Sequence, residues 1–163
     1  MQTSANGRKI IEAFEGLYLR PYYDSVGVLT KRLRMGYGHT NLGGVPPAVV
    51  PGLVWTQEQA DQVLSADLKS VEVDVTAIMA GIPLTQDQFD ALVSFHFNTG
   101  DLRKSSIPVK MRMGNLEGAI YTLTLYNHAG GNVLPGLTRR RQCEAALMRN
   151  DLATAFKIAG ING

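Results

Sequence analysis

The sequence contains a single cysteine, Cys143. One cysteine excludes an internal disulfide and a metal cluster built from cysteines. An excess of charge of one sign is also lacking, because 16 Lys and Arg residues stand against 14 Asp and Glu residues. Nucleic-acid-binding proteins normally carry a clear basic excess. No nucleic-acid partner is therefore expected.

Long apolar runs are missing as well. The most apolar segment, VPPAVVPGLVW at 45–55, is interrupted by prolines and is shorter than the roughly 20 residues of a membrane-spanning helix. The first residues, MQTSANGRKIIEAFEG, contain no uninterrupted apolar stretch, so we expect neither a signal peptide nor stable membrane insertion. The hydrophobic content is ordinary for a globular protein, since 45% of the 163 residues are hydrophobic. A chain of this length and composition can bury a substantial core.

Helical patterns dominate the chain. A short N-terminal helix is predicted, capped by Thr3 or Ser4 and ended by Gly16. TQEQ at 56–59 and TQDQ at 85–88 both have the spacing of a capping box, and each predicts the start of a helix. Further helices are predicted at 106–113, 115–126, 136–149 and 151–158.

Residues 21–44 have a different character. Glycines and a proline separate short runs such as VGVLT and RMGYG, which is typical of a small antiparallel sheet. The prolines in residues 45–54 remove backbone donors and predict a loop there. The fold class is therefore α+β, with a small β-containing segment in a mainly helical chain and a cleft between the two parts.

Glu15 is the acidic residue with the most informative position. It lies at the edge of an apolar stripe formed by Ile10, Ile11 and Phe14, in the last turn of the predicted helix. Partial burial and the negative end of the helix dipole both favour the protonated form of a carboxyl group. A general acid requires that form. The alternative is a surface glutamate at a frayed helix end.

Asp24 and Thr30 follow in the next segment. Asp24, in YYDSVG, is either a turn residue that binds backbone N–H groups or the second carboxylate of a glycosidase pair, kept ionised by polar surroundings. Thr30 is either a residue that favours a strand or the holder of a water molecule beside the two acids. The residues alone leave these alternatives open.

FEGLYLRPYYDSVGVLT at 14–30 resembles the active-site segment of the phage-type lysozymes, a muramidase family that includes phage endolysins. The family motif is a Glu, eight residues, an Asp, five residues and a Thr, and it is matched by Glu15, Asp24 and Thr30. Three further segments resemble the rest of the family in the same order: 36–40, 84–100 and 129–147. The resemblance therefore runs nearly from one end of the chain to the other.

This resemblance implies a single two-lobed, lysozyme-like domain over residues 1–163. The β-containing lobe would span about 16–55, and the helical lobe about 56–163 plus the N-terminal helix. The resemblance also implies a monomer that hydrolyses the β-1,4 bond between N-acetylmuramic acid and N-acetylglucosamine in peptidoglycan, without a metal or organic cofactor. The alternatives are a wall-binding module without hydrolytic activity and a glycosidase of another amino-sugar polymer such as chitosan.

The resemblance also implies roles for the three motif residues. Glu15 would protonate the leaving glycosidic oxygen. Asp24 would stabilise positive charge on the sugar, and would either position a water molecule or attack the anomeric carbon. Thr30 would help to hold that water. The sequence does not distinguish an inverting from a retaining mechanism, because the configuration of the product depends on the separation of the two carboxyl groups.

Further expectations concern binding and location. Residues 31–35 precede GYGHT, where the family usually has a shorter connection. We hypothesise that Arg32 and Arg34 contact the anionic wall polymer, an inert insertion being the alternative. Asn98 is a candidate for binding a sugar hydroxyl or acetamido group, or else a helix-end cap. A family member without a signal peptide would remain in the host cytoplasm until it is released to the cell wall.

Three other features are expected to be structural. The histidines are too scattered to predict a zinc site, and His39 is expected to be hydrogen-bonded near the sheet rather than to act as a base. Cys143 is expected to be a small buried residue. The arginines at 139–141 are expected to lie on a solvated helix face or to pair with Glu144.

Overall fold

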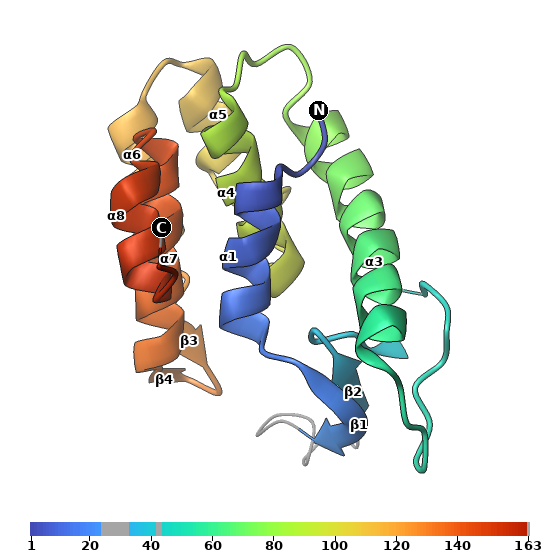
Figure 1. Ribbon diagram of the computed structural model, residues 1–163. Helices are drawn as coiled ribbons and strands as arrows, with labels where there is room; N and C mark the ends of the chain where they lie inside the picture. Colours follow the sequence, from blue (N-terminus) through green and yellow to red (C-terminus); the bar gives the residue numbers. More distant parts are fainter. Residues whose placement is uncertain (24–32, 42–43, 163) are drawn as a thin grey trace. The chain divides into compact units, whose positions relative to one another are not determined.

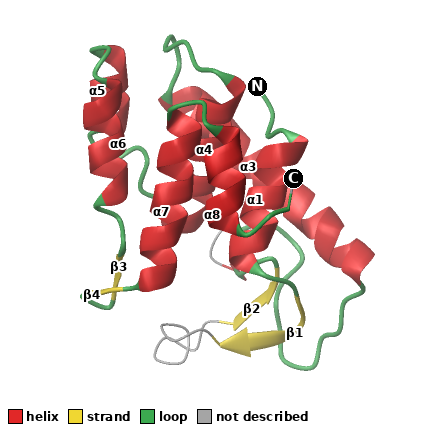
Figure 2. Cartoon of the chain, turned by 60° about the vertical axis from the view of Figure 1, so that its left-hand side comes forward, coloured by secondary structure: helices red, strands yellow, loops and turns green. Residues whose placement is uncertain are grey.

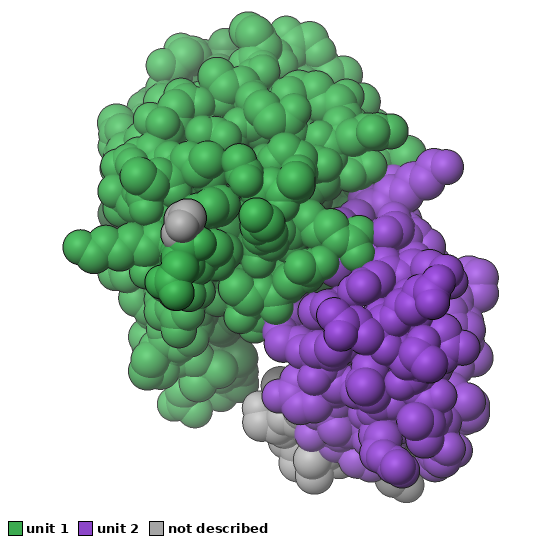
Figure 3. Space-filling model, in the orientation of Figure 1, with its two compact units in different colours: residues 1–14, 71–163 green, residues 15–70 purple. Residues whose placement is uncertain are grey.

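The computed structural model describes residues 1–23, 33–41 and 44–162. The chain forms two compact units, coloured separately in Figure 3: unit 1 is Met1–Phe14 with Val71–Gly163, and unit 2 is Glu15–Ser70. The boundaries fall at the end of α1 (Ala5–Glu15) and inside α3 (Gln57–Ile78), as Figure 1 allows the reader to follow. Over the described ranges, no helix combines the length and apolar character needed to cross a membrane.

Unit 1 is mainly helical. In addition to most of α1 and the end of α3 it contains α4 (Gln86–Thr99), α5 (Ile107–Arg112), α6 (Leu116–Thr124), α7 (Pro135–Met148) and α8 (Leu152–Ala159). α7 packs against α4, α6 and α8, and Figure 2 shows it among these helices. The last four helices lie within two residues of their predicted limits. Those predictions are confirmed.

The helix starts follow the capping signals of the sequence. Ser4 Oγ accepts the Gly7 N–H at 3.0 Å at the start of α1. At the start of α3, Thr56 Oγ1 accepts the Gln59 N–H at 3.1 Å and Gln59 Oε1 accepts the Thr56 N–H at 2.9 Å. The corresponding box begins α4 at Thr85. Each box satisfies backbone donors that would otherwise have no partner in the helix.

Unit 2 contains a two-stranded antiparallel sheet. β1 (Tyr18–Tyr23) pairs with β2 (Leu33–Gly36), so that Tyr18 faces Gly36 and Tyr22 faces Arg34. Four steps along β1 therefore correspond to two along β2, a break in register of the kind that a β-bulge produces, called the β-bulge below. The predicted antiparallel sheet is confirmed in this part, whereas the run VGVLT lies outside the described residues.

The core of unit 2 forms around β2 and the first half of α3. Met35, Trp55, Leu64 and Leu68 are buried there. A Cβ added to Gly36 would lie 3.0 Å from Cζ3 of Trp55, so the indole ring packs where glycine leaves room. The proline-rich segment before Trp55 contains no helix or strand among its described residues, as the sequence predicted.

Two features of unit 1 differ from expectation. A short hairpin, β3 (His128–Ala129) with β4 (Asn132–Val133), was not predicted; two glycines with positive φ form its turn. The expectation of a solvated arginine face is wrong for Arg140 and Arg141, which are 3% and 1% exposed.

The alternative of pairing with Glu144 is confirmed. The ion pair from Nε of Arg141 to Oε2 of Glu144 measures 2.7 Å, and that from Nε of Arg140 to Oε1 measures 3.4 Å. Ser94 Oγ also donates to Glu144 Oε1, at 2.6 Å. The carboxylate offsets the cost of burying the guanidinium groups, and these bonds join α4 to α7.

Candidate functional site

Glu15 is the last residue of α1, where the chain passes into unit 2. The helix ends there because Gly16 adopts a φ of 68°, a left-handed conformation that glycine tolerates. The Glu15 side chain is half-buried. It also lies at the negative end of the helix dipole, so both features expected from the sequence are present.

The Glu15 carboxyl group rests against the backbone of Gly38. A Cβ built on Gly38 would lie 2.5 Å from Oε2 and 3.2 Å from Cδ of Glu15. The carboxyl group therefore occupies the space that a side chain at position 38 would fill. Gly38 also has a φ of 74°, so both its conformation and its surroundings require glycine.

Arg34 approaches the same point from β2. Its Nη1 donates to the Gly38 carbonyl oxygen at 3.2 Å and lies 3.9 Å from the position of the added Cβ. The Arg34 guanidinium and the Glu15 carboxyl group thus converge on one glycine. Arg34 is half-buried, so this cation is partly shielded from water near the acid.

The turn that carries Gly38 is anchored by His39. The backbones of Met35 and His39 exchange hydrogen bonds of 2.9 and 2.8 Å, which close the turn. His39 Nδ1 lies 2.7 Å from Oδ2 of Asp67, and Nε2 lies 2.8 Å from the carbonyl oxygen of Pro47. Both partners are acceptors, an arrangement that favours the charged imidazole, in which both ring nitrogens donate.

The environment of His39 agrees with this assignment. Burial lowers the pKa of His39, but the hydrogen bonds to Asp67 and Pro47 and the charge of Asp67 together raise it above its ordinary value of 6.5. The residue is 3% exposed. The prediction of a structural, hydrogen-bonded histidine is confirmed.

The other predicted site residues are distributed differently. Asp24, Thr30 and Arg32 lie outside the described residues, so their roles stay predictions. Asn98 is an exposed residue near the end of α4 in unit 1. The cap of α4 is Gly100, whose N–H donates to the His96 carbonyl oxygen at 2.8 Å. The structure therefore brings together Glu15 and Arg34 of the predicted set.

Sequence reasoning missed the role of Gly38 as the support of Glu15. The signal was the pair of glycines in GYGHT, which marks backbone positions with special conformations or close contacts. Over residues 1–23, 33–41 and 44–162, no group of three or more His, Cys, Asp and Glu side chains could hold a metal ion.

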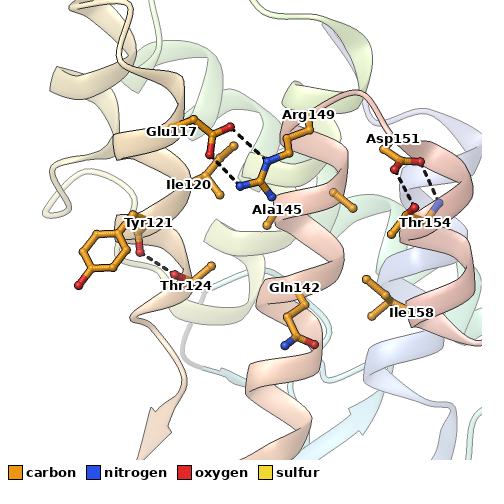
Figure 4. A pocket seen from close by; sticks show the side chains of 11 residues that line it. Glu117, Ile120, Tyr121, Thr124, Gln142, Ala145, Arg149, Asp151, Thr154 and Ile158 are labelled. Carbon is orange, nitrogen blue, oxygen red and sulfur yellow. Dashed lines mark hydrogen bonds and ion pairs between the residues drawn. The ribbon is translucent and has the colours of Figure 1, made fainter.

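A groove of about 550 Å³ lies in unit 1 between α6, α7 and α8 (Figure 4). Glu117 and Arg149 form an ion pair of 2.8 Å at its edge, and the Asp151 carboxylate caps α8 through Thr154. The ring of Tyr121 points away from it in Figure 4. Because the Glu117, Arg149 and Asp151 side chains are all bound to neighbouring residues, we assign no chemistry to this groove.

Comparisons with known proteins identify the family. The phage lysozyme family model matches residues 12–144. The endolysin of Acyrthosiphon pisum secondary endosymbiont phage 1 is 35% identical over 92% of this chain and 99% of its own. The relatives differ in length, because the chain spans 99% of this endolysin but 54% of the endolysin of Bacillus phage B103.

Solved structures agree with the sequence comparison. The endolysin from Escherichia coli O157:H7 phage FAHEc1 matches with a TM-score of 0.77 and 32% identity, over 91% of this chain and 93% of its own. The muramidase domain of SpmX from Asticaccaulis excentricus matches with a TM-score of 0.76 and 32% identity, over 90% and 97%. With most of its length matched by the family model and by these relatives, the chain belongs to the phage lysozyme family.

Proposed function

We propose that Glu15 is the general acid with which this phage muramidase cleaves the β-1,4 bond between N-acetylmuramic acid and N-acetylglucosamine. The chain is a glycoside hydrolase that lyses peptidoglycan, as its endolysin relatives and the similarity to a muramidase domain indicate. These relatives favour an enzyme over a wall-binding module without activity.

The observation that carries this assignment is the position of the Glu15 carboxyl group on Gly38. A carboxyl group that rests against backbone is restricted in orientation, and a fixed orientation is what proton transfer to a bound glycosidic oxygen requires. Proton transfer leaves Glu15 as a carboxylate. The Arg34 guanidinium beside it is placed to stabilise that negative charge.

The remaining roles complete the reaction. Asp24 stabilises the positive charge that develops on the sugar and either positions a water molecule or attacks the anomeric carbon. Thr30 helps to hold that water. Arg32, Arg34 and Asn98 bind the wall polymer. The configuration of the first-formed product, read by NMR, distinguishes inversion from retention.

The replacement Glu15→Gln tests the assignment. The amide has nearly the same shape, but its N–H groups are not acidic enough to protonate the leaving oxygen, so the rate of lysis of permeabilised bacteria should fall by about 10²- to 10⁴-fold. Glu12→Gln is the matched control, because Glu12 lies on the same helix and pairs with Arg8 at 2.8 Å. It should lyse cells at the wild-type rate. A folded Glu15→Gln protein that retains more than about a tenth of wild-type activity excludes Glu15 as the acid.

Three broader statements belong to the same proposal. Residues 1–163 act as one catalytic domain, with the β-containing lobe at about 16–55 and the helical lobe formed by the rest. The enzyme acts as a monomer without stable membrane insertion. It stays in the host cytoplasm until it is released to the cell wall, where endolysins act. Equilibrium sedimentation and fractionation of infected cells test these statements.

A further inference from the structure

Tyr18 and Tyr22 form a close, tilted aromatic pair on β1. Their ring centroids are 4.1 Å apart, with an angle of 32° between the planes. Tyr18 is 47% exposed, whereas Tyr22 is half-buried. The Tyr22 ring thus supports the Tyr18 ring, which keeps much of its surface open to solvent.

The stack depends on the β-bulge. Four residues of regular strand span about 13 Å, too far for two rings to stack directly. The bulge places Tyr18 opposite Gly36 and Tyr22 opposite Arg34, so it shortens β1 between the tyrosines. Pro21 lies within this stretch and has no N–H to pair. Bulges of this kind re-aim side chains and are frequent next to active sites.

The Tyr18 ring also lies against the backbone that follows the acid. A Cβ built on Gly16 would be 3.5 Å from Cε2 of Tyr18, so the ring lies against the residue that follows Glu15. Tyr22 faces Arg34 across the sheet, and Arg34 approaches Gly38, on which Glu15 rests. The exposed tyrosine is therefore part of the surroundings of the proposed acid.

We infer that Tyr18, supported by Tyr22, is a stacking platform for an N-acetylhexosamine ring of the glycan strand next to the bond that is cleaved. The inference rests on the proposed function of Glu15. The axial C–H groups of a pyranose give it an apolar face that packs on an aromatic ring, while its hydroxyl and acetamido groups remain in water. Tyrosine supplies such a surface at a small entropic cost, because it has few rotatable bonds.

The same strand supplies a matched control. Tyr23 is also 47% exposed, but successive side chains of a strand point to opposite faces. It pairs with Leu33 rather than with Arg34. An exposed tyrosine by itself is ordinary on a protein surface. If exposure alone mattered, Tyr18 and Tyr23 would respond alike to substitution.

The test uses soluble glycan oligomers of alternating N-acetylmuramic acid and N-acetylglucosamine, with kcat and KM measured for each variant. Tyr18→Ser should raise KM about 3- to 10-fold, which corresponds to the loss of one aromatic contact. kcat should change less. Tyr18→Phe keeps the ring and should retain the wild-type KM, and so should Tyr23→Ser.

Two results would overturn the inference: a folded Tyr18→Ser protein with a wild-type KM, or an equal rise in KM for Tyr23→Ser. A second readout uses the Glu15→Gln protein, on which the bound oligomer stays intact: stacking on the Tyr18 ring shifts the sugar C–H resonances upfield. Absence of that shift at saturation also refutes it. The two proposals can fail separately. If Glu15 is not the acid, Glu15→Gln keeps a kcat near the wild-type value, and the comparison of KM between the Tyr18 and Tyr23 variants is unaffected.

Discussion

Replacing Asp67 by asparagine tests whether the charged His39 stabilises unit 2. The His39 side chain is 2% exposed and donates from both ring nitrogens. A hydrogen bond that involves charged groups contributes about 1.5–3 kcal/mol. Asp67 is 14% exposed, so water screens the pair only in part. We expect Asp67→Asn to lower the free energy of unfolding at pH 5 by about 1.5–3 kcal/mol, below the ~3–5 kcal/mol of a fully buried broken pair.

The destabilisation should decrease as the pH rises. The pKa of His39 is raised above 6.5 in the folded protein. The contribution of the pair is therefore fully present below pH 6.5 and is lost as the pH rises through the folded-state pKa. Above that pKa the ring is neutral and donates from one nitrogen only, so its attraction to the Asp67 carboxylate no longer includes a charge–charge contribution and the cost of removing that carboxylate falls. Urea unfolding of both proteins at pH 5 and pH 9 measures the difference.

Asp74→Asn is the control for this experiment. Asp74 also lies on α3 and faces a histidine, His96, at 3.4 Å, but it is 58% exposed. An exposed pair of this kind contributes ~0–1 kcal/mol. The reasoning is refuted if Asp67→Asn costs no more than Asp74→Asn, or if its cost is the same at both pH values.

Three other substitutions or reactions have definite expected outcomes. Gly38→Ala would place a Cβ 2.5 Å from Oε2 of Glu15 and would force alanine into a left-handed conformation at a cost of ~1–2 kcal/mol. Turbidity assays should therefore show strongly reduced lysis by the folded variant. Lysis at the wild-type rate would contradict the contact between Gly38 and Glu15. Glu144→Gln would remove the buried carboxylate that pairs with two buried guanidinium groups, so urea unfolding should show a loss of ~3–5 kcal/mol. A loss below ~1 kcal/mol, typical of an exposed pair, would contradict this expectation. Burial and the nearby Glu144 carboxylate raise the pKa of Cys143 to about 12, so the native protein should not react with a thiol reagent at pH 8 and the unfolded protein should.

The helices were predictable because their signals are local. The two capping boxes bring together residues three positions apart, as in the Thr85 and Gln88 pair. Gly16 and Gly100 end α1 and α4 with a backbone conformation that glycine adopts readily. The prolines before Trp55 likewise act on their own backbone. Each of these effects is complete within a few residues, so the sequence displays it directly.

The support of Glu15 and the burial of the arginines could not be predicted in the same way. Gly38 meets Glu15 only after the chain has formed the β1–β2 pair, and no spacing rule links the two positions. Charged side chains are almost never fully buried unless they are paired. Arg140 is buried because Ser94, 46 positions away, and Glu144 both bind it. Such contacts depend on tertiary structure.

The discontinuity of unit 1 has a consequence for the order in which the protein folds. Ser4 binds Asp90 across 86 positions, and the Phe14 ring contacts the Arg139 guanidinium on α7. During synthesis the first helix therefore emerges long before its partners, whereas unit 2 is one continuous segment whose contacts are closer in sequence. Loop closure over long separations slows folding. We expect unit 2 to be able to acquire structure on the ribosome. The apolar face of the first helix should stay exposed, and accessible to chaperones, until α7 has been synthesised.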